Sequence, residues 1–256
     1  MLRKRIIFTL IYENGFFMQS RNFRLQKVGN IDWLEKNYKF QHIAFSLDEL
    51  IVLNASRENK DISKFANILS QLVNDVFIPI AAGGGIRSTD DAKILFNNGA
   101  DKIVLNTILS KDAALVQELI TTYGSQSIIA AIDYKKIDGK NKVFIEDGKE
   151  ELAIELEEYI EYVVGLNVGE IYLNCIDKDG TGFGYDFDTI AKISESLNIP
   201  LILAGGAGNE KHLIEGLSMN NVNAVATANL FNFIGDGLPK ARKRILDERL
   251  NIAQWN

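Results

Sequence analysis

Two pairs of adjacent glycines are the part of this sequence best suited to binding phosphate. Gly84-Gly85 and Gly205-Gly206 each follow a short apolar stretch, and the next such stretch along the chain ends in Asn106-Thr107 or Ala228-Asn229, respectively. Bare glycines let backbone N–H groups approach an anion, and the N-terminus of a following helix favours negative charge. The turn Asp179-Gly180-Thr181 can add backbone donors to the second pair. We expect two phosphate cradles and a ligand with a phosphate at each end, although such glycines also serve simply as tight turns.

Asp133, at the end of another apolar stretch, is the best candidate for a catalytic group. A carboxylate at this point can act as a general acid or base. The internal repeat described below pairs Asp133 with Ile11, which can neither give nor take a proton. Asp177 and Asp179 are expected near the same end of the sheet, but their local sequence is at least as typical of a turn.

Alternating elements must position these residues. Short β-prone stretches alternate with longer segments of helical period such as Asp61–Asn74 and Glu151–Leu166, which is typical of repeated βα units. This pattern predicts an α/β protein whose residues 1–256 form one closed (β/α)₈ barrel, with active-site residues at the C-terminal ends of the strands. The eight expected strands are Arg5–Ile11, Glu49–Asn54, Phe77–Ala82, Asp101–Asn106, Ser127–Asp133, Glu170–Cys175, Ile199–Ala204 and Asn223–Ala228.

The second half of the chain restates the first, which predicts two homologous half-barrels. Ile78-Pro79 recurs as Ile199-Pro200, beside the repeated glycine pairs. Residues Tyr134 to Lys149 carry two turn signals and are expected to form a β-hairpin that breaks this symmetry. Residues Asn14 to Asn30 are long and polar and are expected to form a mobile active-site loop.

Four charged residues stand at or near the starts of expected strands, on the opposite face of the barrel: Arg5, Glu49, Lys102 and Glu170. By themselves, charges at strand starts are commonly solvated. His42 and His212 have no acidic or cysteine neighbours at ligand spacing, so neither a metal nor another cofactor is expected.

The composition excludes several classes of protein and of binding partner. The net charge of -6 argues against nucleic acid as the main partner, because phosphate neutralisation needs clustered Lys and Arg. No apolar run approaches the length of a membrane-spanning helix. A single cysteine, Cys175, excludes a disulfide framework and fits a reducing cytoplasm. Small molecules and proteins are the expected partners.

Several motifs occur along the chain in a fixed order: Leu2-x-Lys4-Arg5-Ile6-Ile7, Gly83-Gly84-Gly85-Ile86, Gly99-Ala100-Asp101-Lys102, Asn106-Thr107, Gly124-Ser125-Gln126, Ala131-Ile132-Asp133, Asp179-Gly180-Thr181-x-x-Gly184-Tyr185-Asp186 and Gly205-Gly206-Ala207-Gly208. Through these motifs the chain resembles, over its full length, the cyclase subunit of imidazole glycerol phosphate synthase. That resemblance implies a (β/α)₈ barrel bound at its N-terminal face to a glutaminase. Ammonia from the glutaminase would pass through the barrel to a substrate that is phosphorylated at both ends and undergoes imidazole ring closure.

The resemblance is uneven at the expected catalytic end. Asp133 matches one of the two catalytic aspartates of the family, whereas Ile11 stands where the other is expected. Other departures are Gln19 for a loop lysine, Asn54 for an aspartate, Ala204 for a serine and Asn229 for a serine.

At the other end, Arg5, Glu49, Lys102 and Glu170 all match the charged gate through which the family admits ammonia, and Asp101 matches a residue facing the glutaminase. The leading hypothesis is therefore a synthase subunit that still receives ammonia but aminates or amidinates another phosphorylated substrate. Barrels that resemble the family in this way are associated with nitrogen-containing sugars of bacterial surface polysaccharides. The alternatives are the family's own cyclase reaction in histidine biosynthesis, and a non-catalytic barrel that activates a glutaminase.

Overall fold

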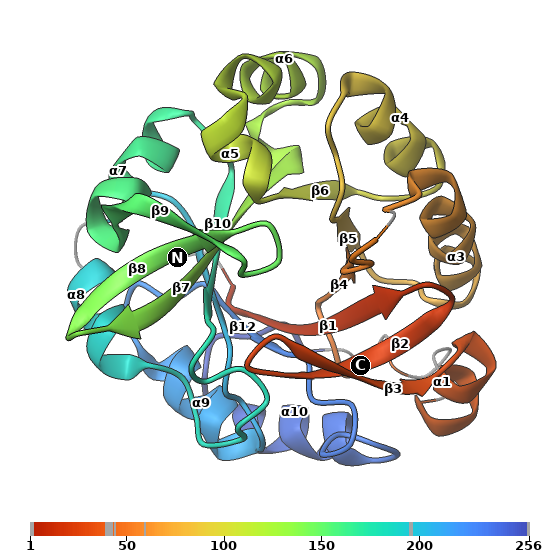
Figure 1. Ribbon diagram of the computed structural model, residues 1–256. Helices are drawn as coiled ribbons and strands as arrows, with labels where there is room; N and C mark the ends of the chain where they lie inside the picture. The colour runs from red at the N-terminus through yellow and green to blue at the C-terminus, as the bar shows by residue number, and fades with distance from the viewer. Residues whose placement is uncertain (1–2, 39–42, 44, 59, 195–196, 255–256) are drawn as a thin grey trace.

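Eight parallel strands close into a barrel, as expected from the alternating pattern (Figure 1). The structure is a computed structural model that describes residues 3–38, 43, 45–58, 60–194 and 197–254. Closure follows from the pairing, because β1 contacts both β4 and β12, and β10 contacts both β7 and β11. The barrel strands are β1 (Arg5–Glu13), β4 (Glu49–Asn54), β5 (Ile80–Gly83), β6 (Lys102–Leu105), β7 (Ile128–Ile137), β10 (Glu170–Cys175), β11 (Leu201–Ala204) and β12 (Ala224–Thr227). The predicted (β/α)₈ architecture is thereby confirmed.

Helices surround the barrel and bury one apolar face each against it. In α3, for example, Phe65 and Leu69 are fully buried, and the Asp61 side chain accepts a hydrogen bond from the Lys64 N–H at the start of the helix. The helices are α1 (Ile31–Tyr38), α3 (Ile62–Asp75), α4 (Thr89–Asn97), the short α5 (Thr107–Lys111), α6 (Ala113–Tyr123), α7 (Leu156–Gly165), α8 (Phe187–Ser194), α9 (Glu210–Ser218) and α10 (Gly237–Asp247). No helix in the described ranges is long and apolar enough to cross a membrane.

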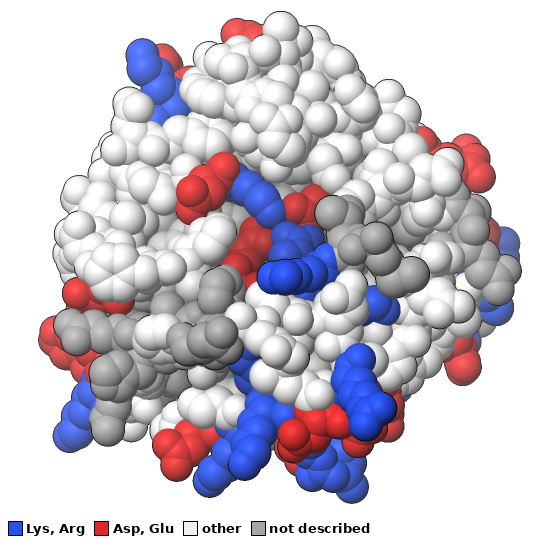
Figure 2. Space-filling model, turned by 180° about the vertical axis from the view of Figure 1, so that it is seen from behind, with Lys and Arg blue, Asp and Glu red and all other residues white. Residues whose placement is uncertain are grey.

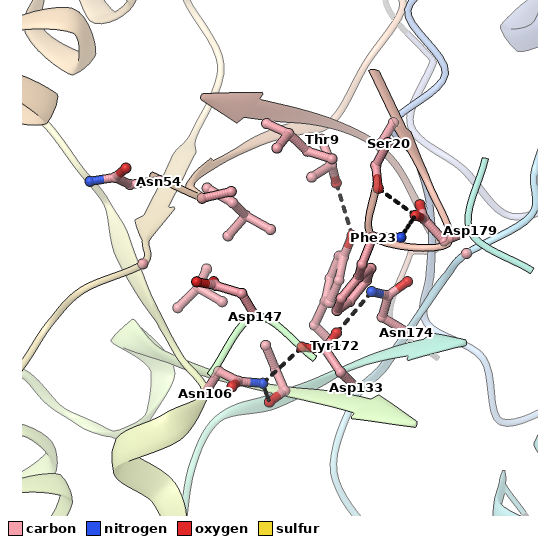
Figure 3. A pocket seen from close by; sticks show the side chains of 18 of the residues that line it. Thr9, Ser20, Phe23, Asn54, Asn106, Asp133, Asp147, Tyr172, Asn174 and Asp179 are labelled. Atoms are coloured by element: carbon pink, nitrogen blue, oxygen red, sulfur yellow. Dashed lines mark hydrogen bonds between the residues drawn. The ribbon is translucent and has the colours of Figure 1, made fainter. Parts of the chain in front are cut away.

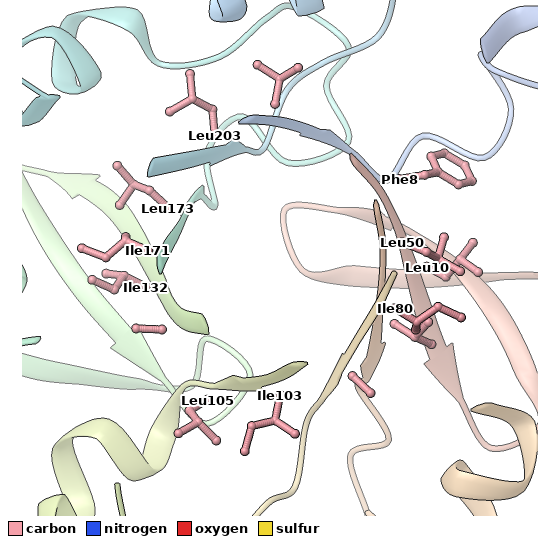
Figure 4. Close-up of a cluster of buried hydrophobic side chains, with 14 of the residues drawn as sticks. Phe8, Leu10, Leu50, Ile80, Ile103, Leu105, Ile132, Ile171, Leu173 and Leu203 are labelled. Atoms are coloured by element: carbon pink, nitrogen blue, oxygen red, sulfur yellow. The ribbon is translucent and has the colours of Figure 1, made fainter. Parts of the chain in front are cut away.

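Strand alternation sorts the core into two layers. Leu and Ile side chains such as Leu50, Ile103 and Leu173 point outward from the barrel towards the helices (Figure 4). The alternate positions point inward and form a separate cluster. Small residues are frequent in this inner cluster: Ala81, Ala131, Ala204, Ala224 and Ala226. The barrel interior is therefore lined less bulkily than the outer layer.

Two antiparallel hairpins extend from the barrel, one in each half (Figure 1). The expected hairpin after Asp133 is confirmed, and it continues into a third strand: β7 pairs with β8 (Lys140–Ile145), which pairs with β9 (Glu150–Glu155). The segment Asn14 to Asn30 is not the expected loop, because β1 pairs with β2 (Phe16–Arg21), which pairs with β3 (Arg24–Gly29). Each half-barrel thus carries a hairpin of the same kind, one after β1 and one after β7. The prediction that the hairpin after Asp133 breaks the symmetry of the two halves was wrong.

Two of the sequence-based expectations failed for physical reasons, namely the loop from Asn14 to Asn30 and a helix starting at Glu151. Asn14 and Gly15 have positive φ angles of 47° and 92°, the geometry of a tight hairpin turn, which the polar composition of the segment concealed. The helix expected from Glu151 begins only at Leu156, because Glu150–Glu155 pairs with β8 although Glu, Leu and Ala are good helix formers. In both places strand pairing overrides local propensity.

Candidate functional site

At the N-terminal end of the barrel, four charged side chains contact one another. The Arg5 guanidinium lies 2.5 Å from a Glu49 carboxylate oxygen and also bonds Glu170. The Lys102 ammonium lies 3.1 Å from Glu49 and 2.6 Å from Glu170. Each cation therefore contacts both carboxylates, and we call this set the charged ring. Mixed acidic and basic side chains gather at the centre of this face, seen in Figure 2.

The charged ring is largely buried, which determines its electrostatics. The Glu49 side chain is only 2% exposed and that of Glu170 10%. Burial raises the pKa of Glu49 against the opposing influence of Arg5 and Lys102. Burial alone would also raise the pKa of Glu170, but its hydrogen bond and charge contacts with Arg5 and Lys102 lower it. Because each carboxylate has two cations within contact, we regard both as ionised. The interpretation of these charges as solvated strand starts is wrong for this ring.

Between the ring and the opposite mouth, the barrel interior contains few polar groups. The Tyr172 hydroxyl lies 3.2 Å from the Thr9 hydroxyl, and both residues are buried. Burial raises the pKa of Tyr172, so this phenol stays neutral. Tyr172 and Thr9 also line the pocket at the mouth, so they mark its floor.

A pocket of about 200 Å³ opens at the C-terminal ends of the strands, and Asp133 lines it between Asn106 and Asn174 (Figure 3). One oxygen of Asp133 accepts a 2.8 Å hydrogen bond from the Asn174 amide, and the other accepts a 3.1 Å bond from the Asn106 amide. Burial raises the pKa of Asp133 to about 7, assisted by the negative charges of Asp179 and Asp147 and opposed by the Asn174 bond. Asp133 can therefore exchange a proton near neutral pH.

Ile11 lines the same pocket from β1. Its neighbour Tyr12 points to the other side of the strand, where it contacts the rings of Phe17 and Phe65. Four of the described pocket residues carry a carboxylate, and of these Asp133 lies on a barrel strand. Glu146 and Asp147 lie on the turn after β8, and Asp179 lies on the turn after β10. The pocket thus has the asymmetry expected from the sequence.

The structure brings the residues of the first cradle together, namely Gly84, Gly85, Asn106 and Thr107. Gly84 has φ 95°, and a Cβ there would lie 2.2 Å from the Asn54 carbonyl oxygen, so only glycine fits. The Asn106 amide also donates to the Ala131 carbonyl at 3.0 Å, which fixes its orientation. The following helix, α5, has only five residues, so it contributes little of the expected helix dipole.

The second cradle is also assembled in this pocket, from Gly180, Gly205, Gly206, Ala228 and Asn229. A Cβ on Gly206 would lie 2.0 Å from the Gly184 carbonyl oxygen. The Asn229 side chain accepts hydrogen bonds from the N–H groups of Phe231 and Asn232, which orders the turn after β12. Residues 230–236 form turns, so the helix expected directly after this cradle begins only at α10.

Asp179 lines the pocket, yet its carboxylate is hydrogen-bonded to the hairpin of β2 and β3. It accepts hydrogen bonds from the Ser20 hydroxyl and from the Phe23 N–H. Burial raises the pKa of Asp179, and these two bonds oppose the rise. Gln19, at the position of the expected lysine, accepts a 2.9 Å bond from the Leu230 N–H and so ties the same hairpin to the segment after β12.

The tips of the two hairpins meet over the pocket. A Cβ on Gly148, in the turn between β8 and β9, would lie 2.6 Å from the ring of Phe23, in the turn between β2 and β3. Arg57 donates to the Phe23 carbonyl at 2.5 Å. The segment from Asn14 to Asn30, which was expected to be a mobile loop, is therefore a hairpin that covers the site.

Sequence reasoning missed Tyr172, Asn174, Lys60 and Asp147 as pocket residues. Tyr172 and Asn174 follow Glu170 at alternate positions of β10, so strand alternation could have placed them inside the barrel. Lys60 and Asp147 lie on turns, where no periodic pattern places a side chain.

The histidine that the structure describes, His212, forms a hydrogen bond within the protein. His212 accepts a hydrogen bond from the Gly208 N–H through Nδ1, and His42 lies outside the described residues. Within the part of the chain that the structure describes, no cluster of three or more His, Cys, Asp or Glu side chains could hold a metal ion.

Comparison with known proteins places this architecture in a family. The family described as "Histidine biosynthesis protein" matches residues 22–235. A Parasynechococcus marenigrum protein named "Putative imidazole glycerol phosphate synthase subunit hisF2" is 46% identical over the whole chain and 95% of its own length. The "Imidazole glycerol phosphate synthase subunit HisF" of Chlorobium limicola is 35% identical over 98% of this chain and 99% of its own. The chain therefore belongs to the histidine biosynthesis protein family, as a HisF-type cyclase subunit.

Proposed function

We propose that this barrel receives ammonia from a HisH-type glutaminase at its N-terminal face and delivers it to a phosphorylated substrate other than that of histidine biosynthesis. The observation that carries the proposal is the contrast along the barrel axis: a complete charged ring lies at one end, and a pocket that pairs Asp133 with Ile11 lies at the other. The ring is the entrance in this proposal, and the pocket is the reaction site.

The charged ring supports the role of an entrance because it lies at the start of a small-residue interior. Ammonia is neutral and small, and five members of the inner cluster are alanines rather than larger side chains. Passage requires one contact of the ring to open. With each cation on two carboxylates, one contact can open while the charge stays paired, which avoids the several kcal/mol that an unpaired buried ion costs.

Asp133 supports chemistry with ammonia at the mouth. When ammonia attacks an electrophilic carbon, the adduct must lose a proton from nitrogen, and a base with a pKa near 7 is well matched to accept it. The amides of Asn174 and Asn106 hold the two oxygens in place. The family's imidazole ring closure is expected to use two catalytic carboxylates. This pocket has Ile11 at the position of the second one, and Ile11 cannot transfer a proton.

The two cradles support a phosphorylated substrate. We propose that Gly84, Gly85, Asn106 and Thr107 bind one phosphate, and that Gly180, Gly205, Gly206, Ala228 and Asn229 bind the other. As the acceptor class we propose an amination or amidination in the biosynthesis of nitrogen-containing surface sugars, on the resemblance set out above.

Reconstitution with its glutaminase tests this function. The barrel should co-purify with the glutaminase and stimulate its activity. Glutamine and the partner should then support nitrogen transfer to a phosphorylated amino-sugar, with little turnover of the histidine-pathway bisphosphate. A glutaminase that neither binds nor gains activity would eliminate the ammonia route. Efficient turnover of the histidine-pathway substrate would instead assign the family's own reaction.

A further inference from the structure

Lys60 and Asp147 form an ion pair inside the pocket, beside the first cradle. The Lys60 ammonium lies 2.6 Å from Asp147 Oδ1, and the two side chains are 21% and 23% exposed. A Cβ placed on Gly85 would lie 2.7 Å from the Cβ of Lys60, so the lysine stem covers this glycine. In Figure 3, Asp147 lies between Asn54 and Asn106, and Asn106 is a residue of the first cradle.

The turn that carries Asp147 is fastened to the cradle itself. The N–H of Glu146 donates a 3.2 Å bond to the Thr107 hydroxyl, a cradle residue. Glu146, Asp147 and Gly148 have positive φ angles of 52°, 58° and 77°. Non-glycine residues keep such a conformation only where their surroundings hold it. Here the Thr107 bond and the Lys60 ion pair are two contacts that hold the turn against the cradle.

The positive charges that line the pocket lie on the side of the first cradle, where Lys60 can contribute to phosphate binding. The cations among the described lining residues are Arg57, Lys60 and Arg87, all on the side of the first cradle. Arg57 is engaged with the Phe23 carbonyl. The described residues of the second cradle include no cation. Among the described residues that line this pocket, Lys60 is therefore the lysine that can add direct charge to phosphate binding, and it does so at the first cradle.

We propose that Lys60 is a further substrate-binding residue of the first cradle, and that Asp147 competes with the phosphate of the ligand for its ammonium group. This inference rests on the proposed function only in assuming a phosphorylated ligand. A phosphate monoester carries a charge of about −1.5 to −2 at pH 7, more than one carboxylate, and so displaces Asp147. A ligand without phosphate does not displace it. The exchange therefore selects phosphorylated ligands.

The two partners should change phosphate binding in opposite directions. Unfolding midpoints are measured at increasing inorganic phosphate, which reports affinity because a ligand of the folded state stabilises it. Lys60→Gln should weaken phosphate binding about tenfold, the usual worth of a charged hydrogen bond. Asp147→Asn should strengthen it several-fold, about threefold or more, by removing the competitor. Lys60→Arg should retain most of the affinity.

Lys111→Gln is the matched control, because Lys111 pairs with Glu150 on the same hairpin, 2.5 Å away and exposed. It should leave phosphate binding unchanged. A purely structural ion pair predicts that Lys60→Gln and Asp147→Asn weaken binding together, and that result would overturn the inference, as would equal binding by all variants. A wild-type protein that phosphate does not stabilise would instead count against the phosphorylated substrate of the proposed function.

Discussion

At the N-terminal end of the barrel, four charged side chains from four barrel strands satisfy one another, whereas at the C-terminal mouth the charged groups depend on turns and hairpins. Arg5, Glu49, Lys102 and Glu170 all lie on barrel strands. At the mouth, Asp133 lies on β7, but Asp179 and Asp147 come from turns and bond groups on other segments. The two ends are therefore built with different degrees of rigidity.

This difference explains how the mouth can change chemistry without loss of the fold. The ring residues lie on barrel strands, so replacing one of them removes one of the two ring contacts of each partner. Ile11 makes no comparable demand, because it packs beside Leu53 and Met18 in the sheet whether or not the pocket contains a second carboxylate. The residues of the entrance are thus constrained by the stability of the fold, whereas the residues of the mouth are constrained mainly by the reaction that they catalyse.

Restoring a carboxylate opposite Asp133 should have the largest effect. Each general acid or base is typically worth about 10² to 10⁴ in rate. With ammonia and the histidine-pathway bisphosphate, the wild type should therefore turn over slower than an ordinary cyclase subunit by at least that factor. Ile11→Asp, alone or with Gln19→Lys, should recover part of the loss in a steady-state assay.

Ile11→Asn controls for polarity at this position, since it is close in size to Asp but transfers no proton at neutral pH. It should stay as slow as the wild type. Wild-type turnover comparable to an ordinary cyclase subunit would contradict the divergence of the mouth and leave the comparison of the two ends without functional meaning.

Breaking the charged ring should have the next largest effect. Glu49→Gln leaves Arg5 and Lys102 sharing only Glu170, and truncating a buried ion pair costs about 3 to 5 kcal/mol. The free energy of unfolding in urea should fall by that order. Glu155→Gln removes the carboxylate of an exposed pair with Lys140, so it should lower the free energy of unfolding far less than Glu49→Gln does. Equal losses would mean that the ring is no better shielded than the surface.

The sequence predicted the barrel well because its strands are buried on both faces. Glu49–Asn54 and Glu170–Cys175 were placed with the bounds that β4 and β10 have in the structure. Apolar runs and glycine turns of this kind carry the fold in local composition. The hairpin from Phe16 to Gly29 was missed because the polar composition of the segment outweighed the Asn14-Gly15 turn signal, and because its contacts with β1 and the distant Asp179 are not visible in local sequence.

The site divides in the same way. Residues at strand ends, such as Asp133 and Asn106, were predicted and lie together in the pocket. Lys60 and Asp147 were not predicted, because the chain folds two turns far apart in sequence onto one point. Local sequence locates strand ends, whereas contacts between turns require the three-dimensional structure.

The pH dependence of stability should identify Asp133 as the protonated group of the mouth. Its pKa in the folded protein is about 7, against an ordinary value of 3.8. The folded state therefore binds more protons between these values, and the stabilisation is present below pH 4 and is lost as the pH rises through 7. Asp133→Asn should remove this loss. Urea unfolding from pH 4 to 8 should show the variant gaining on the wild type up to about pH 7 and then levelling off; parallel curves would contradict the raised pKa.

Loosening the cover of the mouth should have the smallest effect. Ser20 is buried, and its hydroxyl donates to the Asp179 carboxylate. Ser20→Ala removes one hydrogen bond to a charged group, worth about 1.5 kcal/mol, while the Phe23 N–H still bonds Asp179. Amide hydrogen exchange should accelerate in β2 and β3 and stay unchanged in β4 and β6, because the barrel does not depend on this contact.

Ser218→Ala removes a hydroxyl that donates to the Ile214 carbonyl on the exposed side of α9, and it should leave hairpin exchange at the wild-type rate. If Ser20→Ala accelerated exchange equally in the barrel strands, the hairpin would be part of the barrel's cooperative unit rather than a separately held cover, and the distinction between a rigid entrance and an adaptable mouth would fail.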